Sequence, residues 1–124
     1  ISVEPVGGGA RVKVRLYGID CPERRQAYGE AARFFVNELT LFQLTEIDEK
    51  GKDRYGRVVA VVYLANGESL QAELLTAGLA WVWPKYCRDC LEWEQLQQEA
   101  MITHRGLWTD EMPIPPWKWR NQRR

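Results

Sequence analysis

The sequence has few of the residues that histidine-based catalysis or a membrane span would require. It contains one histidine and has a formal net charge of zero, because 17 Lys and Arg residues balance 17 Asp and Glu residues. No apolar run approaches the roughly 18 residues of a membrane-spanning helix, and no signal peptide is recognisable. The single His104 excludes catalysis by a pair of histidines, and its place on a predicted helix favours a packing or surface role.

Cysteine is also scarce, with three residues in the chain. Cys87 and Cys90 form one Cys-x-x-Cys pair, and Cys21 stands apart. One such pair without a second pair or a nearby histidine does not complete a tetrahedral zinc site. Residues 83–86 match the setting of a redox-active pair only loosely, so incidental or disulfide-forming cysteines are favoured and redox chemistry is a remote alternative.

The length and composition are those of one globular domain, which we expect to span residues 1–124. Of the residues, 45% are hydrophobic and 27% are charged. Lys and Arg are unevenly spread, with one concentration at residues 11–33 and another at residues 50–57. This distribution is compatible with a local basic groove on a neutral protein, although scattered solvated charge is the plain alternative.

Apolar and polar residues alternate over residues 11–16, which predicts a half-buried strand. The Gly7-Gly8-Gly9 turn before it makes residues 1–6 its hairpin partner, and Pro22 ends it just after Asp20. Further strands are expected around residues 42–47, 58–64 and 79–83. A polar loop is expected at residues 48–53 and a turn at Asn66-Gly67.

Three helices are expected from apolar stripes and capping residues. They span residues 29–39, residues 69–77 with Gly78 as the C-cap, and a segment from Asp89, capped by a box with Glu92, to Gly106. The tail at residues 110–124 is rich in Pro and Trp, and its residues 113–119 hold too many prolines for a helix. Short strands with three helices indicate a β-barrel with helices (α+β), and an OB-type barrel fits best.

Two segments carry the chemistry, Arg15-Leu16-Tyr17-Gly18-Ile19-Asp20-Cys21-Pro22-Glu23 and Asp53-Arg54-Tyr55-Gly56-Arg57. Two arginines and two carboxylates suit attack on a phosphodiester, because they offer a place for a hard cation, a base for water and forks for phosphate. The plain alternatives are a surface ion pair between Arg15 and Asp20 and an ordinary turn at Tyr55-Gly56. The six tryptophans are expected in core and tail packing more than in base stacking.

Three further segments follow these two along the chain: Leu75-x-x-Gly78-Leu79-Ala80, Arg105-Gly106-Leu107-Trp108 and Pro115-Pro116-Trp117-x-Trp119. The order and the spacing of all five segments carry the information. Together the five segments resemble the staphylococcal nuclease (thermonuclease) family over nearly the whole chain. The resemblance implies a staphylococcal-nuclease-like OB-fold with three helices packed on a small barrel.

The resemblance also assigns roles. It implies that Arg15 and Arg57 grip the phosphate and that Glu23 activates the attacking water. It implies that Asp20 binds calcium through its carboxylate and that Cys21 binds it through its backbone carbonyl. The chemistry agrees, because calcium prefers carboxylate and carbonyl oxygens and arginine forms paired hydrogen bonds to phosphate.

Substrate contacts are implied for Arg54, Tyr55 and Tyr86. The expected activity is Ca²⁺-dependent hydrolysis of single-stranded DNA and RNA with low sequence specificity, leaving 3′-phosphates. The alternative is a non-catalytic nucleic-acid or protein-binding module of OB type. By the same resemblance we expect a secreted or periplasmic protein.

Two departures from the family pattern are expected to matter. The family has an Asp-Gly-Asp segment and a first barrel strand ahead of the position of Ile1, where this sequence begins. For this chain alone we expect weaker calcium binding and an open barrel edge through which it associates or loses stability. The loop from Glu23 to Tyr28 is shorter than in the staphylococcal enzyme, so substrate contacts there are expected to differ.

Overall fold

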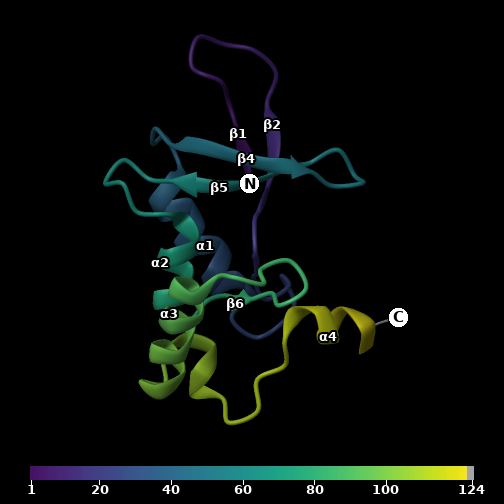
Figure 1. The fold of residues 1–124 in the computed structure, drawn as a ribbon, viewed down its shortest axis with the longest axis vertical. Coiled ribbons are helices and arrows are strands. Elements are labelled where there is room, and N and C mark those ends of the chain that lie inside the picture. The colour runs from purple at the N-terminus through teal and green to yellow at the C-terminus, as the bar shows by residue number, and fades with distance from the viewer. Residues whose placement is uncertain (123–124) are drawn as a thin grey trace.

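Two parallel strands form the centre of the larger sheet in a computed structural model, which describes residues 1–122 (Figure 1). These strands are β2 (Val12–Leu16) and β5 (Val58–Tyr63), and they pair in parallel. The antiparallel strands β1 (Ser2–Val3) and β4 (Glu46–Lys52) lie at the edges, giving the order β1-β2-β5-β4. β5 is almost entirely apolar and rich in β-branched residues. Its middle is buried, as this composition predicts.

The chain turns sharply after β2 and enters a second, two-stranded sheet. This sheet pairs β3 (Ile19–Asp20) with β6 (Trp81–Val82) in antiparallel orientation. Gly18 forms the turn with φ 76°, and a Cβ there would lie 2.7 Å from Sγ of Cys87. A residue without a side chain is therefore required at the point where the two sheets meet.

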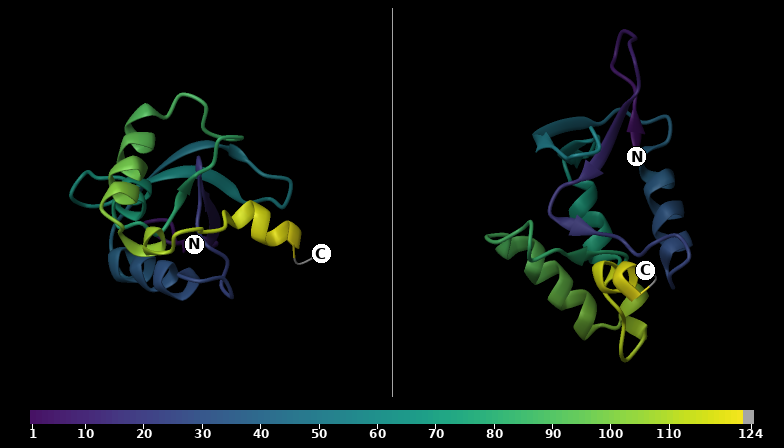
Figure 2. Two further views of the ribbon diagram at one scale, coloured as in Figure 1. Left: turned by 90° about the horizontal axis from the view of Figure 1, so that it is seen from below. Right: turned by 90° about the vertical axis from the view of Figure 1, so that its right-hand side faces the viewer.

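The helices are α1 (Gly29–Thr40), α2 (Leu70–Thr76), α3 (Leu91–Ile102), α4 (Pro116–Gln122) and the short 3₁₀-helix η1 (Gly106–Thr109). Figure 1 shows α1, α2 and α3 grouped on one side of the molecule, and both it and the left view of Figure 2 show α4 well apart from α3. No helix within residues 1–122 combines the length and apolar character needed to cross a membrane.

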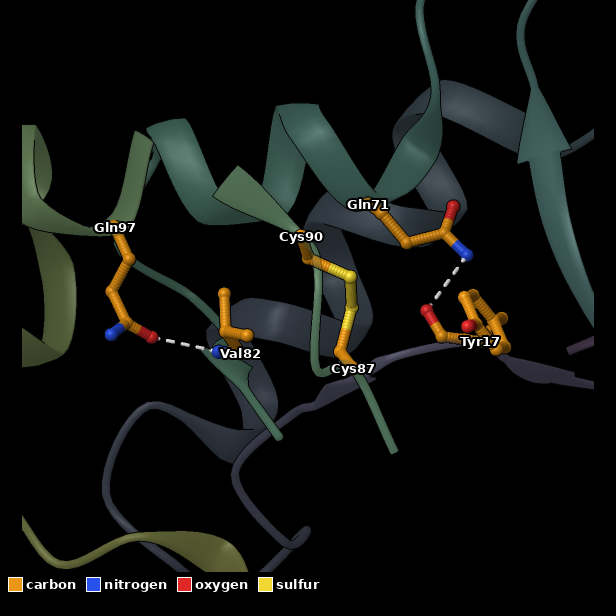
Figure 3. Close-up of a disulfide and its surroundings, with 6 residues drawn as sticks. All are labelled: Tyr17, Gln71, Val82, Cys87, Cys90 and Gln97. Carbon is orange, nitrogen blue, oxygen red and sulfur yellow. Dashed lines mark hydrogen bonds between the residues drawn. A yellow bond between two sulfur atoms is a disulfide. The ribbon is translucent and has the colours of Figure 1, made fainter. Parts of the chain in front are cut away.

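Gln71 of α2 ties this helix to the sheet from within the core. Its side chain is fully buried, and its Nε2 donates to the carbonyl oxygens of Ala60 (3.0 Å) and Tyr17 (3.3 Å). Its Oε1 accepts from the Val62 amide at 3.3 Å. A buried polar group that is satisfied in this way holds its partners in place, so the chain between β2 and β3 is fixed to α2 (Figure 3).

The α+β class is confirmed, but the expected OB-type barrel, which was predicted to have one open edge, is not seen as a closed barrel among residues 1–122. The sheet is open and mixed, and β1 and β4 are its outer strands. The number of helices is also corrected, because the tail contributes α4 in addition to the three expected. Pro116 occupies the first position of α4, where the missing N–H costs nothing, so the prediction that residues 113–119 are not helical is wrong for residues 116–119. Residues 123 and 124 lie outside the described residues.

Two other element predictions need correction. The strand expected around residues 42–47 begins only at Glu46 and continues through the expected polar loop to Lys52, while Phe42 is 97% exposed. An edge strand tolerates this polar run because few of its side chains must be buried. The third helix begins at Leu91 with Cys90 as its uncapped N-cap, so the predicted box from Asp89 to Glu92 does not form.

A groove that gathers the predicted site residues

A groove of about 1200 Å³ runs between β2, β3, the β4–β5 turn, the segment after β6, and α4. Every residue given a site role from the sequence lines it: Arg15, Asp20, Cys21, Glu23, Arg54, Tyr55, Arg57 and Tyr86. The two segments singled out in the sequence therefore meet in space, as predicted. The individual roles of these residues stay predictions.

The parallel pairing of β2 and β5 puts the two arginines on one face of the sheet. Arg15 is the register partner of Val59, and Arg57 precedes Val59 by two residues. Side chains two residues apart on a strand point to the same face. Arg15 and Arg57 therefore project together into the groove, although 42 residues separate them in the chain.

Asp53 holds Arg57 within the β4–β5 turn. Its Oδ2 accepts from Nε of Arg57 at 2.6 Å, and its Oδ1 accepts from the backbone amides of Tyr55 and Arg57, both at 2.9 Å. Desolvation works to raise the pKa of Asp53, but the hydrogen bonds from Arg57 and Tyr55 outweigh it and lower the pKa below its ordinary value. Arg57 thus has a fixed anchor that leaves its outer nitrogens for a ligand.

Arg15 is held by aromatic rings instead of a carboxylate. Its guanidinium carbon lies 4.6 Å from the ring centroid of Trp83 and 5.7 Å from that of Tyr86. Such stacking stabilises a cation without using its N–H donors. Burial lowers the pKa of Arg15 from its ordinary value, but a guanidinium remains charged at any working pH. The ion pair between Arg15 and Asp20, which was the plain alternative for this segment, is not formed within the described residues, where Asp20 pairs with Arg120.

The carboxylates of Asp20 and Glu23 converge on Arg120 of α4. Nη2 of Arg120 donates to Oδ2 of Asp20 at 2.7 Å, and its Nη1 donates to Oε1 of Glu23 at 2.5 Å and to Oδ1 of Asp20 at 3.3 Å. Burial raises the pKa of Asp20 above its ordinary value, while the hydrogen bonds and charge of Arg120 act to lower it. The two acidic groups together form a site for one positive charge.

Glu23 sits in a loop with little freedom. The Gln26 amide donates to the Glu23 carbonyl at 2.8 Å, and the Glu23 amide donates to Oε1 of Gln26 at 3.0 Å. A Cβ on Gly29 would overlap the Glu23 carbonyl oxygen. The start of α1 therefore packs directly on the backbone that carries the predicted base.

The remaining predicted residues differ in exposure. Tyr55 is 72% exposed, and the guanidinium carbons of Arg54 and Arg57 lie 5.3 and 5.7 Å from its ring centroid. Cys21 is a free cysteine, and burial raises the pKa of its thiol to about 12. Its side chain is therefore a neutral packing group, consistent with a role limited to its backbone carbonyl.

The groove is basic although the chain is neutral. Among the described residues, the lining contains eight Lys and Arg side chains: Arg15, Arg33, Lys50, Lys52, Arg54, Arg57, Lys85 and Arg120. Three carboxylates accompany them, those of Asp20, Glu23 and Asp53. The excess of positive charge suits a polyanionic ligand.

Three residues of the site were missed from the sequence. Asp53 was named in its segment but given no role, although an Asp two residues before a Tyr-Gly turn is a signal for a side-chain-capped turn. Trp83 was assigned to packing, and nothing local marks it as a platform for Arg15. Arg120 lies 100 residues beyond Asp20, in a tail predicted to be irregular, so no local pattern could have paired them.

Comparisons with known proteins agree with this geometry. The pattern of the family described as Staphylococcal nuclease homologue matches residues 13–110. An Escherichia coli protein described as an uncharacterized endonuclease is 34% identical over 122 residues, covering 98% of this chain and 79% of that protein. A micrococcal nuclease of Shigella flexneri is 36% identical over 118 residues, covering 88% of this chain and 68% of its own. A staphylococcal-like nuclease of Arabidopsis thaliana is 34% identical over 116 residues, covering 92% and 35%.

Proposed function

This chain belongs to the staphylococcal nuclease family and is a nuclease, and from that premise we propose that it hydrolyses phosphodiester bonds of single-stranded DNA and RNA in a Ca²⁺-dependent reaction with little sequence preference. One observation supports the proposal most. Two arginines and two carboxylates, carried by separate segments, line one basic groove. Nucleases of the staphylococcal nuclease family generally use Ca²⁺.

In the proposed reaction, a water oxygen attacks phosphorus while the carboxylate of Glu23 accepts the proton that the water loses. The bond from phosphorus to the 5′-oxygen breaks. That oxygen leaves with the electron pair and takes a proton from solvent, so the products carry a 3′-phosphate and a 5′-hydroxyl. Arg15 and Arg57 donate hydrogen bonds to the non-bridging oxygens, where negative charge grows in the transition state.

The residues present fit a calcium ion in the chemistry of their donors. Ca²⁺ prefers oxygen ligands, and Asp20 and Glu23 already surround one cationic group, the guanidinium of Arg120. When bound, the ion would supply positive charge beside the phosphate. Residues 1–122 hold no group of three or more His, Cys, Asp or Glu side chains suited to a metal. We therefore propose Asp20, with the Cys21 carbonyl, as the ligands and expect low affinity.

The test is Glu23→Gln, which keeps the shape of the side chain but removes the base. We expect kcat on single-stranded DNA to fall by about 10²- to 10⁴-fold, the usual contribution of a general base, with an unchanged circular dichroism spectrum. Glu30→Gln on α1 is the matched control, because Glu30 does not line the groove and, among residues 1–122, its ion pair is with the exposed Arg24 at 3.6 Å.

Cleavage by Glu23→Gln at the wild-type rate would remove Glu23 from the mechanism. If the wild-type protein binds single-stranded DNA but cleaves it no faster with Ca²⁺ than with a chelator, the calcium-dependent reaction is wrong. Binding of single-stranded DNA with no cleavage under either condition would favour the alternative of a non-catalytic binding module for this chain. Comparing single-stranded with double-stranded DNA in the same assay tests the proposed substrate preference.

We also propose that the protein acts outside the cytoplasm, secreted or in a periplasm. The support is the disulfide between Cys87 and Cys90, because disulfides persist mainly in oxidising compartments. Fractionation of the source cells, with an antibody to this chain, tests the proposal. Recovery in the cytoplasmic fraction would overturn it.

A further inference from the structure

The contact between α4 and the two carboxylates is not used by the proposed reaction. Glu23 cannot accept a proton from water, and Asp20 cannot bind a metal ion, through the same oxygens that receive the N–H groups of Arg120. The guanidinium engages both oxygens of Asp20 and one of Glu23. The guanidinium of Arg120 therefore occupies the position where a calcium ion is predicted to bind.

Several independent contacts hold α4 in this place. Gln26, whose side chain accepts from the Glu23 amide, also donates from Nε2 to the Ile114 carbonyl at 2.5 Å. The ring of Trp117 lies parallel to that of Trp83, with an interplanar angle of 7° and centroids 5.9 Å apart. The loop that carries Glu23 and the segment after β6 thus both bind the tail.

The aromatic stack also carries the arginine. The guanidinium carbon of Arg120 lies 5.3 Å from the ring centroid of Trp83, the same ring that lies under Arg15. Trp117 further contacts Trp81 of β6 at 5.8 Å between centroids. The packing of these tryptophans therefore fixes the position of Arg120 beside the carboxylates.

The charges explain why this contact forms. The side chain of Asp20 is only 10% exposed, and a carboxylate so placed is costly unless a positive charge or hydrogen bonds compensate it. Arg120 provides both. A divalent cation would need the same oxygens, and a guanidinium at that distance would repel it. The two cations are therefore alternatives for one site.

We propose that Arg120 is a positioning residue of the active site: it holds Asp20 and Glu23 when no divalent cation is bound, and it must leave them when Ca²⁺ binds. The ion pair of the tail thus lowers the calcium affinity and sets the concentration at which the enzyme becomes active. This inference rests on the proposed calcium dependence.

The first experiment is titration calorimetry of the purified chain with CaCl₂ alone, for wild type, Arg120→Gln, Arg120→Lys and Lys118→Gln. Lys118 is an exposed residue of α4 that does not line the groove, so Lys118→Gln removes one positive charge from the same helix. We expect Arg120→Gln to bind Ca²⁺ at least tenfold more tightly than wild type, and Lys118→Gln to bind it within twofold of wild type.

Arg120→Lys separates displacement from simple charge repulsion. Lysine keeps the charge but cannot form the bidentate fork to Asp20, so displacement predicts tighter calcium binding than in wild type. Repulsion alone predicts an unchanged affinity. Equal affinities of wild type, Arg120→Lys and Arg120→Gln would overturn the inference and leave the calcium site intact. No calcium binding by any variant would overturn both the inference and the proposed metal dependence.

Thermal unfolding gives a second readout without activity. With a chelator present, Arg120→Gln is expected to have a lower Tm than wild type, because Asp20 and Glu23 lose their partner. With saturating Ca²⁺ the difference is expected to vanish or reverse, because a ligand that binds the folded state stabilises it more when it binds more tightly. A Tm difference that is the same with and without Ca²⁺ would indicate a purely structural role and contradict the inference.

Discussion

At the scale of single residues, the four charged groups that are predicted to carry the chemistry, Arg15, Asp20, Glu23 and Arg57, each have a defined partner on the protein. Arg57 is bound to Asp53, Arg15 lies over Trp83, and Asp20 is paired with Arg120. Groups that are fixed before the substrate arrives lose less entropy when it binds. The positions of the predicted catalytic side chains therefore depend on residues such as Asp53, which are not themselves expected to touch the reacting atoms.

Asp53→Asn tests this dependence. The amide oxygen of the asparagine can still accept from the backbone amides of Tyr55 and Arg57. The negative charge and the oxygen that accepts from Nε of Arg57 are lost. We expect kcat to fall roughly tenfold, equivalent to about 1.4 kcal/mol, with a smaller change in KM because Arg57 acts mainly at the transition state. Steady-state kinetics on a single-stranded oligonucleotide measures both constants.

Asp48→Asn is the control, because Asp48 has a comparable ion pair, with Lys50 at 3.0 Å, and does not line the groove. The pKa of Asp53 is lower in the folded state than its ordinary value of 3.8. The interactions of the ionised Asp53 therefore stabilise the fold at pH values above 3.8, and this stabilisation is lost as the pH falls through the folded-state pKa. Wild-type kinetics in Asp53→Asn would show that Arg57 is positioned by other contacts.

At the scale of elements, the segment between β6 and α3 links the site to a disulfide. This segment carries Trp83 and Tyr86, which contact Arg15, and Cys87 and Cys90 form a disulfide within it (Figure 3). Cys87 is buried against the Gly18 turn. The disulfide therefore restrains the aromatic residues that hold Arg15.

Reduction of this disulfide is expected to lower the free energy of unfolding by about 2 kcal/mol, the chain-entropy value for so short a loop. Urea unfolding of the wild type with and without reductant, and of the double variant with Cys87→Ser and Cys90→Ser, measures the change. Cys21 should not interfere, because a buried thiol with a pKa of about 12 is not a reactive thiolate at pH 8. An unchanged urea midpoint after reduction would contradict this prediction.

At the scale of the whole molecule, charge is separated although the total is zero. The positive side chains of the groove are balanced by carboxylates elsewhere, including those of the edge strand β4, whose sequence is Glu-Ile-Asp-Glu-Lys-Gly-Lys. A charged edge strand resists pairing with another chain. Association through a sheet edge stays a prediction, and light scattering would measure it.

Nucleic-acid binding is expected to depend strongly on salt despite the zero net charge. For about four phosphate contacts with a single strand, the association constant should fall roughly 50-fold between 50 and 200 mM NaCl. Fluorescence anisotropy with the Glu23→Gln protein avoids cleavage during the measurement. Lys52→Gln, in the groove, should lower the slope of log K against log salt by about 0.7, whereas Lys118→Gln should not change it. Equal slopes in all three proteins would place binding outside the groove.

Much of this protein was determined by local sequence. The apolar run at residues 58–63 and the helix from Gly29 follow from the hydrophobic period. The cap at Ser69 follows from capping chemistry. Both depend on neighbours a few residues apart. The two site segments were recognisable for the same reason, since each is short and places its charged groups at the end or start of a strand.

The tertiary structure alone decided which charged groups from distant segments meet. Asp20 and Glu23 find Arg120 across 100 and 97 residues, and Arg15 finds Trp83 through the packing of β3 against β6. It also decided that the charged segment 46–52 is a strand, because an edge position needs little apolar surface, and that the tail forms α4. Such long-range outcomes depend on which surfaces the fold brings together, and no local pattern in the chain encodes them.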